Sequence, residues 1–164
     1  MKETQTTYYK TPIGIAEIVG DKYGIRSVSV LDDDAIAESI LNQKTPECLK
    51  ECINQLEEYF KGERTTFNLK LNPKGTDFQK KVWRALLEIT FSKTRTYLQQ
   101  SKTLGDVKAI RAVASANGKN PIWIIIPCHR VIGSDGSLTG YAGGIWRKKW
   151  LLAHENPVKQ QSLF

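Results

Sequence analysis

The stretch TYLQQSKTLGDVKAIRAVASANG (residues 96–118) contains the signals of two consecutive helices joined by a tight turn. Thr96 and Gln99 have the spacing of a capping box, which predicts the start of a short helix. Gly105 breaks that helix, and Asp106 is suited to cap a second one that ends before Gly118. Two short helices around a glycine turn are typical of a helix-turn-helix unit.

Further elements are predicted on both sides of this unit. Thr76 and Gln79 form a second capping box for a helix upstream. Residues 122–126 are apolar and β-branched, which favours a buried strand ended by Pro127, and residues 146–154 have the pattern of an amphipathic helix. The apolar side chains predicted to face inward are Phe78, Val82, Trp83, Leu86 and Leu87 upstream, and Val107, Ile110, Val113 and Ala114 in the second helix.

The front of the chain has a different pattern. Residues 6–19 and 24–33 carry alternating and β-branched residues separated by glycine-containing turns, which predict two or three antiparallel strands. Thr45 is the expected N-cap of a helix with Pro46 at its first position, and residues 67–75 favour one more short strand. The predicted class is α+β: a small N-terminal α/β domain precedes a mostly helical, winged-helix-like helix-turn-helix domain.

Charge is unevenly distributed along the chain. Residues 1–72 hold nine Lys and Arg against twelve Asp and Glu, whereas residues 73–164 hold fifteen against five, within an overall net charge of +7. A basic second half favours a nucleic-acid partner, with a solvated lysine-rich surface as the alternative. The step falls at a Pro/Gly link, so we expect domains at residues 1–72 and 73–157 and a tail at residues 158–164.

The composition also predicts the cellular compartment of the protein. No apolar run approaches the roughly 18 residues of a membrane span, and the first residues lack the apolar core of a signal peptide. Three cysteines form no even disulfide framework. We therefore expect a cytoplasmic protein with reduced thiols, no membrane partner and a monomeric state.

The sequence places a thiol beside a base: His129 and Arg130 directly follow Cys128. A thiol attacks as its thiolate, so a reactive cysteine needs a nearby group that takes or stabilises the proton. Neighbouring side chains in extended backbone point to opposite faces, so His129 would reach Cys128 only through a bend or a bridging water. Residue types alone leave two alternatives open, a nucleophile and a buried inert cysteine. Glycines at 136, 140, 143 and 144 favour a pocket wall over a plain surface turn.

A longer segment around the cysteine, IPCHRVIGSDGSLTGYAGG, resembles the active-site segment of the O6-alkylguanine-DNA alkyltransferases, also called methylated-DNA–protein-cysteine methyltransferases. The likeness continues through GTDFQKKVWRALLEI, RAVASANGKNP and RKKWLLAHE, so it covers residues 75–155. The front half resembles the family's N-terminal domain only in size and element order. The resemblance implies a protein without a cofactor that binds double-stranded DNA in the minor groove and flips out an alkylated guanine. It then moves the O6-alkyl group irreversibly onto the cysteine, once per molecule.

The resemblance also assigns roles to individual residues. Cys128 is the alkyl acceptor, His129 withdraws its proton through a water, Glu155 holds the imidazole in the required tautomer, and Asn120 fixes the turn before the cysteine. Arg111 fills the gap left by the flipped nucleotide. The flipped base is bound by Tyr97, Val131, Tyr141 and Ala142, and the further residues expected at the DNA are Thr96, Ala112, Ser115 and Arg130.

Some positions depart from the family pattern. Ser92 and Ser115 stand where the family usually has glycine, and Gln100-Ser101 replaces an apolar pair. These positions belong to the DNA-facing half, so they bear on DNA affinity and helix packing rather than on the chemistry.

Three further interpretations concern partners. Cys48 and Cys52 lie one helical turn apart, but with only two histidines in the chain we predict no zinc site. The end of the chain, from Gln160 to Phe164, resembles the peptide by which bacterial repair proteins dock on the sliding clamp, with chance as the alternative. Two other functions compete with repair: a non-catalytic protein that recognises alkylated DNA, and a helix-turn-helix regulator that senses alkylation or redox state through Cys128.

Overall fold

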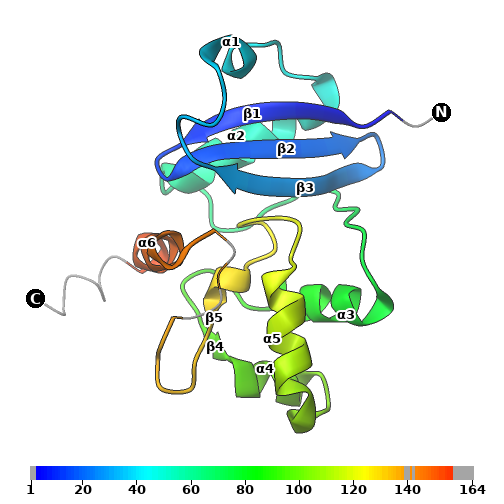
Figure 1. Ribbon diagram of the computed structural model, residues 1–164, viewed down its shortest axis with the longest axis vertical. Helices are drawn as coiled ribbons and strands as arrows, with labels where there is room; N and C mark the ends of the chain where they lie inside the picture. Colours follow the sequence, from blue (N-terminus) through cyan, green and yellow to red (C-terminus); the bar gives the residue numbers. More distant parts are fainter. Residues whose placement is uncertain (1–2, 139–140, 142, 157–164) are drawn as a thin grey trace, which may run out of the picture. The chain divides into compact units, whose positions relative to one another are not determined.

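The computed structural model describes residues 3–138, 141 and 143–156. The chain forms two compact units, Met1–Lys74 with Pro121–Trp123 and Gly75–Asn120 with Ile124–Phe164. The N-terminal unit contains a three-stranded sheet and the C-terminal unit is mostly helical, which confirms the predicted α+β class (Figure 1). Within the described residues, no helix combines the length and the apolar character that crossing a membrane requires.

The N-terminal unit is an antiparallel meander covered by a helix. Strands β1 (Gln5–Thr11), β2 (Gly14–Asp21) and β3 (Gly24–Leu31) pair in the order β1-β2-β3. The central strand is the most buried, and α2 (Lys50–Phe60) packs behind the sheet in Figure 1. A four-residue helix, α1 (Glu38–Leu41), lies in the connection between β3 and α2.

The start of α2 differs from the prediction. A 3-10 turn, Glu47–Leu49, precedes the helix, its N-cap is Pro46, and no side chain caps it. The predicted cap at Thr45 is therefore wrong. The 3-10 turn closes instead by a bond from the Leu49 N–H to the Pro46 carbonyl (3.0 Å), in which the backbone of Pro46 takes the place of a hydroxyl cap. The strand expected at residues 67–75 is reduced to one bridge between Leu71 and Ile25.

The C-terminal unit is built around the helix-turn-helix. It contains α3 (Asp77–Leu86), α4 (Tyr97–Thr103), α5 (Ile110–Gly118) and α6 (Ile145–Glu155), and a short parallel pair of strands, β4 (Arg95–Thr96) and β5 (Val131–Ile132). Both capping boxes are present, at Thr76 and Thr96. Asp106 accepts from the Lys108 N–H as predicted, although the turn it caps is 3-10 and α5 follows it.

A tight turn separates α4 from α5. Gly105 has φ of +87°, which a residue with a side chain rarely adopts, so it ends α4 and redirects the chain. Helix α5 packs against α3, where the Trp83 indole N–H donates to the Ala116 carbonyl (2.9 Å). This bond anchors the second helix of the motif to the core of the unit.

Three of the residues predicted to face inward lie at the surface instead. Val82, Trp83, Leu86 and Val113 are buried, but Phe78 is 40% exposed, Leu87 47% and Val107 50%. Helical periodicity identifies the side of a helix that is apolar, but the width of the buried stripe depends on how many neighbours cover it. Helix α3 and the turn before α5 are covered on only part of that side.

The predicted strand at residues 122–126 is wrong, although its residues are buried. Ile122 makes a single bridge to Val28, with two backbone bonds between Val28 and the segment Pro121–Trp123. Ile124 has φ of +70°, which is rare for a β-branched residue and incompatible with a continuing strand. The run is divided because Pro121–Trp123 belongs to the N-terminal unit and the chain rejoins the C-terminal unit at Ile124.

Candidate nucleophile site

Local backbone bonds hold Cys128 at the start of a 3-10 turn, Cys128–Arg130, that leads directly into β5. The Cys128 N–H donates to the Ile126 carbonyl (2.8 Å), and the Arg130 N–H donates to the Pro127 carbonyl (3.0 Å). The side-chain amide of Asn120 also donates to the Ile126 carbonyl (2.7 Å). Cys128 as a whole residue is partly buried, whereas the side chains of the two residues that follow it are buried.

His129 and Arg130 converge on the carboxylate of Glu155 at the end of α6. The His129 Nε2 lies 2.7 Å from Glu155 Oε2, and the Arg130 guanidinium donates to both carboxylate oxygens, from Nε at 2.8 Å and from Nη2 at 3.0 Å. Arg130 Nη1 also donates to the Ile89 carbonyl (2.6 Å). All three side chains are buried, so the carboxylate is desolvated and yet satisfied by its partners.

The pKa values in this network follow from burial and its charges. Burial alone raises the pKa of Glu155, but the hydrogen bonds and charges of His129 and Arg130 outweigh it and hold this pKa well below its usual range. Burial lowers the pKa of His129, and the Glu155 carboxylate only partly opposes that effect. At neutral pH the carboxylate is therefore ionised, the imidazole is neutral, and its Nε2–H is the proton shared with Glu155.

The second ring nitrogen of the histidine completes this arrangement. With the proton on Nε2, the Nδ1 of His129 is an acceptor; it is buried and has no hydrogen-bond partner within the described part of the chain. The thiol itself is not ionised by its surroundings alone, because burial raises the pKa of Cys128. A hydrogen bond from Asn120 and the charge of Lys148 oppose this increase. The site thus combines a protonated thiol with a neutral base of the correct tautomer.

Three of the four residues predicted to bind a base, Tyr97, Val131 and Tyr141, lie within the described residues. Val131 is fully buried on β5, and Tyr97 and Tyr141 are partly exposed. The Nζ of Lys148, from α6, lies 5.8 Å from the ring centroid of Tyr97 and 6.0 Å from that of Tyr141. Ala142 lies outside the described residues. Sequence reasoning missed Lys148, although a lysine on the side of α6 that carries Leu151 and Glu155 was the available signal.

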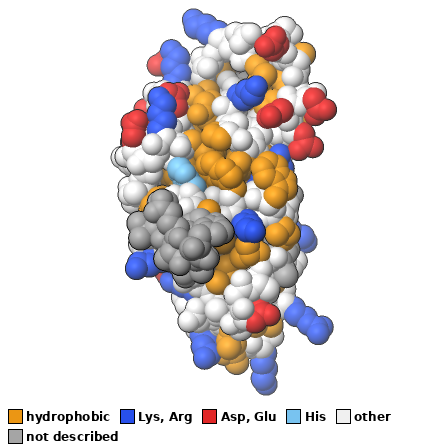
Figure 2. All heavy atoms as spheres, turned by 90° about the vertical axis from the view of Figure 1, so that its left-hand side faces the viewer, with side chains coloured by type: hydrophobic (Ala, Val, Ile, Leu, Met, Phe, Trp, Pro, Cys, Tyr) orange, Lys and Arg blue, Asp and Glu red, His pale blue; other side chains and the backbone are white. Residues whose placement is uncertain are grey.

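The residues predicted to contact DNA divide into two groups. Arg111, Ala112 and Ser115 are exposed on α5, on the side of the helix away from its buried residues. Lysine and arginine side chains project from the C-terminal unit, at the bottom of Figure 2. Thr96 is engaged as the cap of α4. Arg130 is inside the site, where its guanidinium is used by Glu155 and Ile89, so it is not available to DNA phosphates.

The structure shows the surroundings of two of the departures from the family pattern, at Ser92 and at Gln100-Ser101. Ser92 has φ of +64°, the left-handed region that favours glycine, and its N–H points at Glu155 Oε1 (3.4 Å). Gln100 and Ser101 are fully buried in α4, where Arg95 donates to the Gln100 amide oxygen (3.1 Å). The Gln100 side-chain nitrogen and the Ser101 hydroxyl are buried without a hydrogen-bond partner among the described residues, a cost in free energy that an apolar pair would not have.

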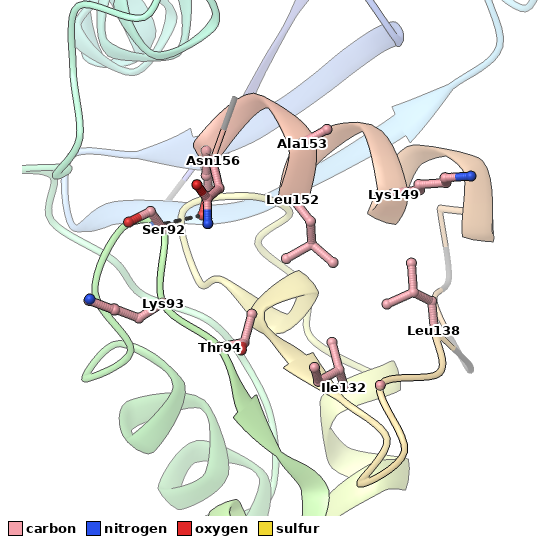
Figure 3. Close-up of a pocket in the computed structure, with 11 residues that line it drawn as sticks. Ser92, Lys93, Thr94, Ile132, Leu138, Lys149, Leu152, Ala153 and Asn156 are labelled. Carbon is pink, nitrogen blue, oxygen red and sulfur yellow. Dashed lines mark hydrogen bonds between the residues drawn. The ribbon is translucent and has the colours of Figure 1, made fainter. Parts of the chain in front are cut away.

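A separate cavity of about 310 Å³ lies beside the network. In Figure 3, Leu152 of α6 points toward Ile132 of β5 across this space, with Ser92 at one end and Leu138 at the other. The described residues that line it are Ser92, Lys93, Thr94, Ile132, Gly136, Leu138, Lys149, Leu152, Ala153, Glu155 and Asn156. Cys128 is not among these described residues, whereas Glu155 of the network is.

The remaining cysteines have different surroundings. Cys48 is exposed, whereas Cys52 is buried, and burial raises the pKa of its thiol to about 12. A thiol with that pKa is unreactive at neutral pH. Among the described residues, no three side chains of the His, Cys, Asp and Glu types gather as they would around a metal ion.

A cysteine next to a buried histidine–carboxylate pair, on a unit that contains a helix-turn-helix, is characteristic of a helix-turn-helix protein with a candidate cysteine nucleophile. Two family models match the chain: the DNA-binding domain of 6-O-methylguanine DNA methyltransferase over residues 77–157, and its ribonuclease-like domain over residues 5–73. A methylated-DNA–protein-cysteine methyltransferase of Methanosarcina barkeri is 47% identical over 150 residues, which cover 89% of this chain and 93% of that relative. The chain therefore belongs to the methylated-DNA–protein-cysteine methyltransferase family.

Solved structures agree with this assignment. The crystal structure of Mycobacterium tuberculosis O6-methylguanine methyltransferase matches with a TM-score of 0.82 and 40% identity, covering 94% of each chain. The structure of Mycobacterium tuberculosis OGT in complex with DNA matches with a TM-score of 0.80 and 39% identity, covering 93% of this chain and 92% of that one.

Proposed function

We propose that this protein repairs DNA by moving the O6-alkyl group of an alkylated guanine onto Cys128, irreversibly and once per molecule. The observation that carries the proposal is the buried hydrogen bond between His129, in the turn that contains Cys128, and Glu155 at the end of α6. Family membership supports it, because relatives that match nearly the whole chain are named methylated-DNA–protein-cysteine methyltransferases.

In the first step, His129 accepts the thiol proton. Its Nε2–H is held by the ionised Glu155, which leaves Nδ1 as the base, and a buried ring nitrogen of this kind is typically satisfied by an ordered water. We propose that such a water relays the proton from Cys128. The imidazolium that forms is stabilised by the carboxylate beside it, as in other nucleophile–histidine–carboxylate sites.

In the second step, the thiolate displaces the guanine at the alkyl carbon. The S–C bond forms with the thiolate's electron pair, the C–O6 bond breaks, and the guanine leaves with a proton returned from His129. A flipped base would be received by Tyr97, Val131 and Tyr141, with Ala142 as a further expected contact and the carbonyls of Cys128 and Val131 facing the exocyclic amine. The thioether is stable, so no step regenerates the thiol.

The proposed DNA partner is a duplex approached from the minor groove by α5. Three small or basic exposed positions, Arg111, Ala112 and Ser115, line the outer side of this helix. Small side chains permit close approach to the sugar–phosphate backbone, and a base must leave the stack before a buried alkyl carbon can be reached. The structure of a relative in complex with DNA supports a DNA partner in general.

The direct test is mass spectrometry of the Cys128 peptide after the protein is mixed with an excess of duplex that contains O6-methylguanine. We expect this peptide to gain one methyl group, with a plateau at one per molecule. The peptide containing Cys48 and Cys52 serves as the internal control and should stay unmodified. Binding of the duplex with no mass change would favour a protein that recognises or senses alkylated DNA without repairing it.

Removing the Arg111 side chain tests base flipping. In Arg111→Ala we expect repair of the duplex to slow by an order of magnitude or so, because an unfilled gap lets the base return to the stack. Transfer from free O6-methylguanine base should not change, and Arg84→Ala, an exposed arginine on α3, is the matched control. Equal losses with duplex and free base would contradict the proposed role.

A sliding clamp is proposed as a further partner from the sequence alone. The segment from Gln160 to Phe164 lies outside the described residues, and docking on a sliding clamp remains a proposal based on its resemblance to clamp-binding peptides. The expectation of a cytoplasmic monomer is likewise carried by the sequence alone.

A further inference from the structure

Lys148 is a buried lysine at the proposed alkyl-transfer site. Its residue is 1% exposed, whereas the next residue on α6, Lys149, is exposed. Lysine is rarely buried to this extent unless its charge has a use or a partner. The Nζ of Lys148 lies within 6.0 Å of the ring centroids of both Tyr97 and Tyr141, the distance at which an ammonium interacts with an aromatic face.

Lys148 lies among several charged and titratable groups, one of which is the thiol of Cys128. On α6 itself, Glu155 is already engaged by Arg130 and His129, so the charges of Glu155 and Arg130 largely cancel. Arg147 on the same helix donates to the Gly143 carbonyl (2.9 Å). From the other elements, the described titratable groups that interact with Lys148 include Cys128 and His129 in the 3-10 turn and the phenols of Tyr97 and Tyr141.

The proton affinities of the lysine and the thiol are linked. Burial lowers the pKa of Lys148, and its interaction with Cys128 raises it again. In return, the charge of Lys148 lowers the pKa of Cys128 against the stronger effect of burial. Each group thus favours the charged form of the other.

Building on the proposed function, we propose that Lys148 is a further functional residue of the site, whose ammonium stabilises the Cys128 thiolate and then the negative charge that passes to the departing guanine. Lys148 keeps its proton throughout, since the thiol proton travels by way of His129 to the guanine. In a buried site a fixed positive charge of this kind acts at low dielectric, where its effect on a nearby anion is larger than in water.

The test measures the reactivity of Cys128 without DNA. Iodoacetamide alkylation of the Cys128 peptide is followed by mass spectrometry between pH 6 and pH 11 in the wild type, K148M, K148R and K149M. We expect K148M to react about tenfold more slowly at pH 7, which corresponds to an increase of about one unit in the thiol pKa. The difference should disappear at high pH, K148R should remain close to the wild type, and K149M should be unchanged.

Two results would overturn the proposal: a loss in K148M of equal size at every pH, which indicates a packing effect, or an unchanged rate at pH 7. Should K148M fail to fold, a measurement on the wild type decides. Methylating Cys128 removes the thiolate, so the Lys148 ammonium should lose its proton at lower pH when followed by NMR of Nζ. An unchanged titration of Lys148 would count against the inference.

A parallel assay distinguishes a failure of the proposed function from a failure of this inference. Single-turnover transfer from an O6-methylguanine duplex should slow in K148M while its affinity for that duplex stays constant. If the wild type fails to accept a methyl group, the proposed function fails, but the thiol titration still decides the role of Lys148.

Discussion

Replacing Cys128 by serine is expected to abolish alkyl transfer while DNA binding persists. A serine hydroxyl is ionised far less readily than a thiol and is a poorer nucleophile at a saturated carbon. His129 and Glu155 would remain in place, but their proton transfer would no longer produce a competent nucleophile. Loss of the nucleophile at sites of this type lowers rates by a factor on the order of 10⁴ or more. Transfer is measured with an end-labelled O6-methylguanine duplex, and affinity by fluorescence anisotropy on the same duplex.

The chain contains a matched control for this experiment. Cys48→Ser removes an exposed thiol from the N-terminal unit and should leave both transfer and binding unchanged. Methyl transfer to any other residue in Cys128→Ser, or full activity of that variant, would contradict the assignment of Cys128 as the acceptor.

The second large effect is expected at Glu155, where Glu155→Ala should cost about 3–5 kcal/mol of unfolding free energy and most of the transfer activity. Without the carboxylate, the Arg130 guanidinium is buried without its counter-charge and His129 loses the group that holds its tautomer. Urea unfolding measures the first effect and single-turnover transfer the second. Glu88→Ala, an exposed carboxylate just after α3, should change unfolding by less than about 0.5 kcal/mol.

The same network predicts how stability depends on pH. The folded-state pKa of His129 lies below its usual 6.5, so the unfolded chain binds the proton more readily, and stability should start to fall as pH drops below about 6.5. The pKa of Glu155 is also lowered in the fold, so a second loss should begin below about pH 4.5. In Glu155→Gln the second loss should be smaller than in the wild type. A wild-type stability that is constant between pH 7 and pH 5 would show that His129 is not held neutral by burial.

The features that local chemistry determines were predictable from the sequence. The capping boxes at Thr76 and Thr96 depend on residues three positions apart, and the turn at Gly105 depends on one φ value. The thiol–histidine pair was visible because its members are adjacent. Pairing of Glu155 with the histidine came from the resemblance to a family, since 26 residues separate them and no local pattern links them.

The predictions that were wrong share a different cause, because they depend on contacts between residues that are far apart in the sequence. Arg130 was expected among the residues at the DNA, but its side chain is bound by Glu155, which lies 25 residues along the chain. The exposed Val107 shows that apolar character alone does not ensure burial. The apolar run at residues 122–126 has the composition of a strand, and nothing in that composition indicates that two units share it.

The division of the apolar run at residues 122–126 between the two units limits how this protein can be recombined with its relatives. Pro121–Trp123 exchanges backbone bonds with Val28 in the N-terminal unit, and Ile124 returns the chain to the other unit four residues before Cys128. The two halves are therefore not interchangeable modules joined at Lys74. A chimera that took its first half from a relative would require a foreign β3 to accept this chain's Pro121–Trp123 segment. The natural unit of exchange is the sheet together with that tripeptide, because a breakpoint at Lys74 separates β3 from the segment that pairs with it.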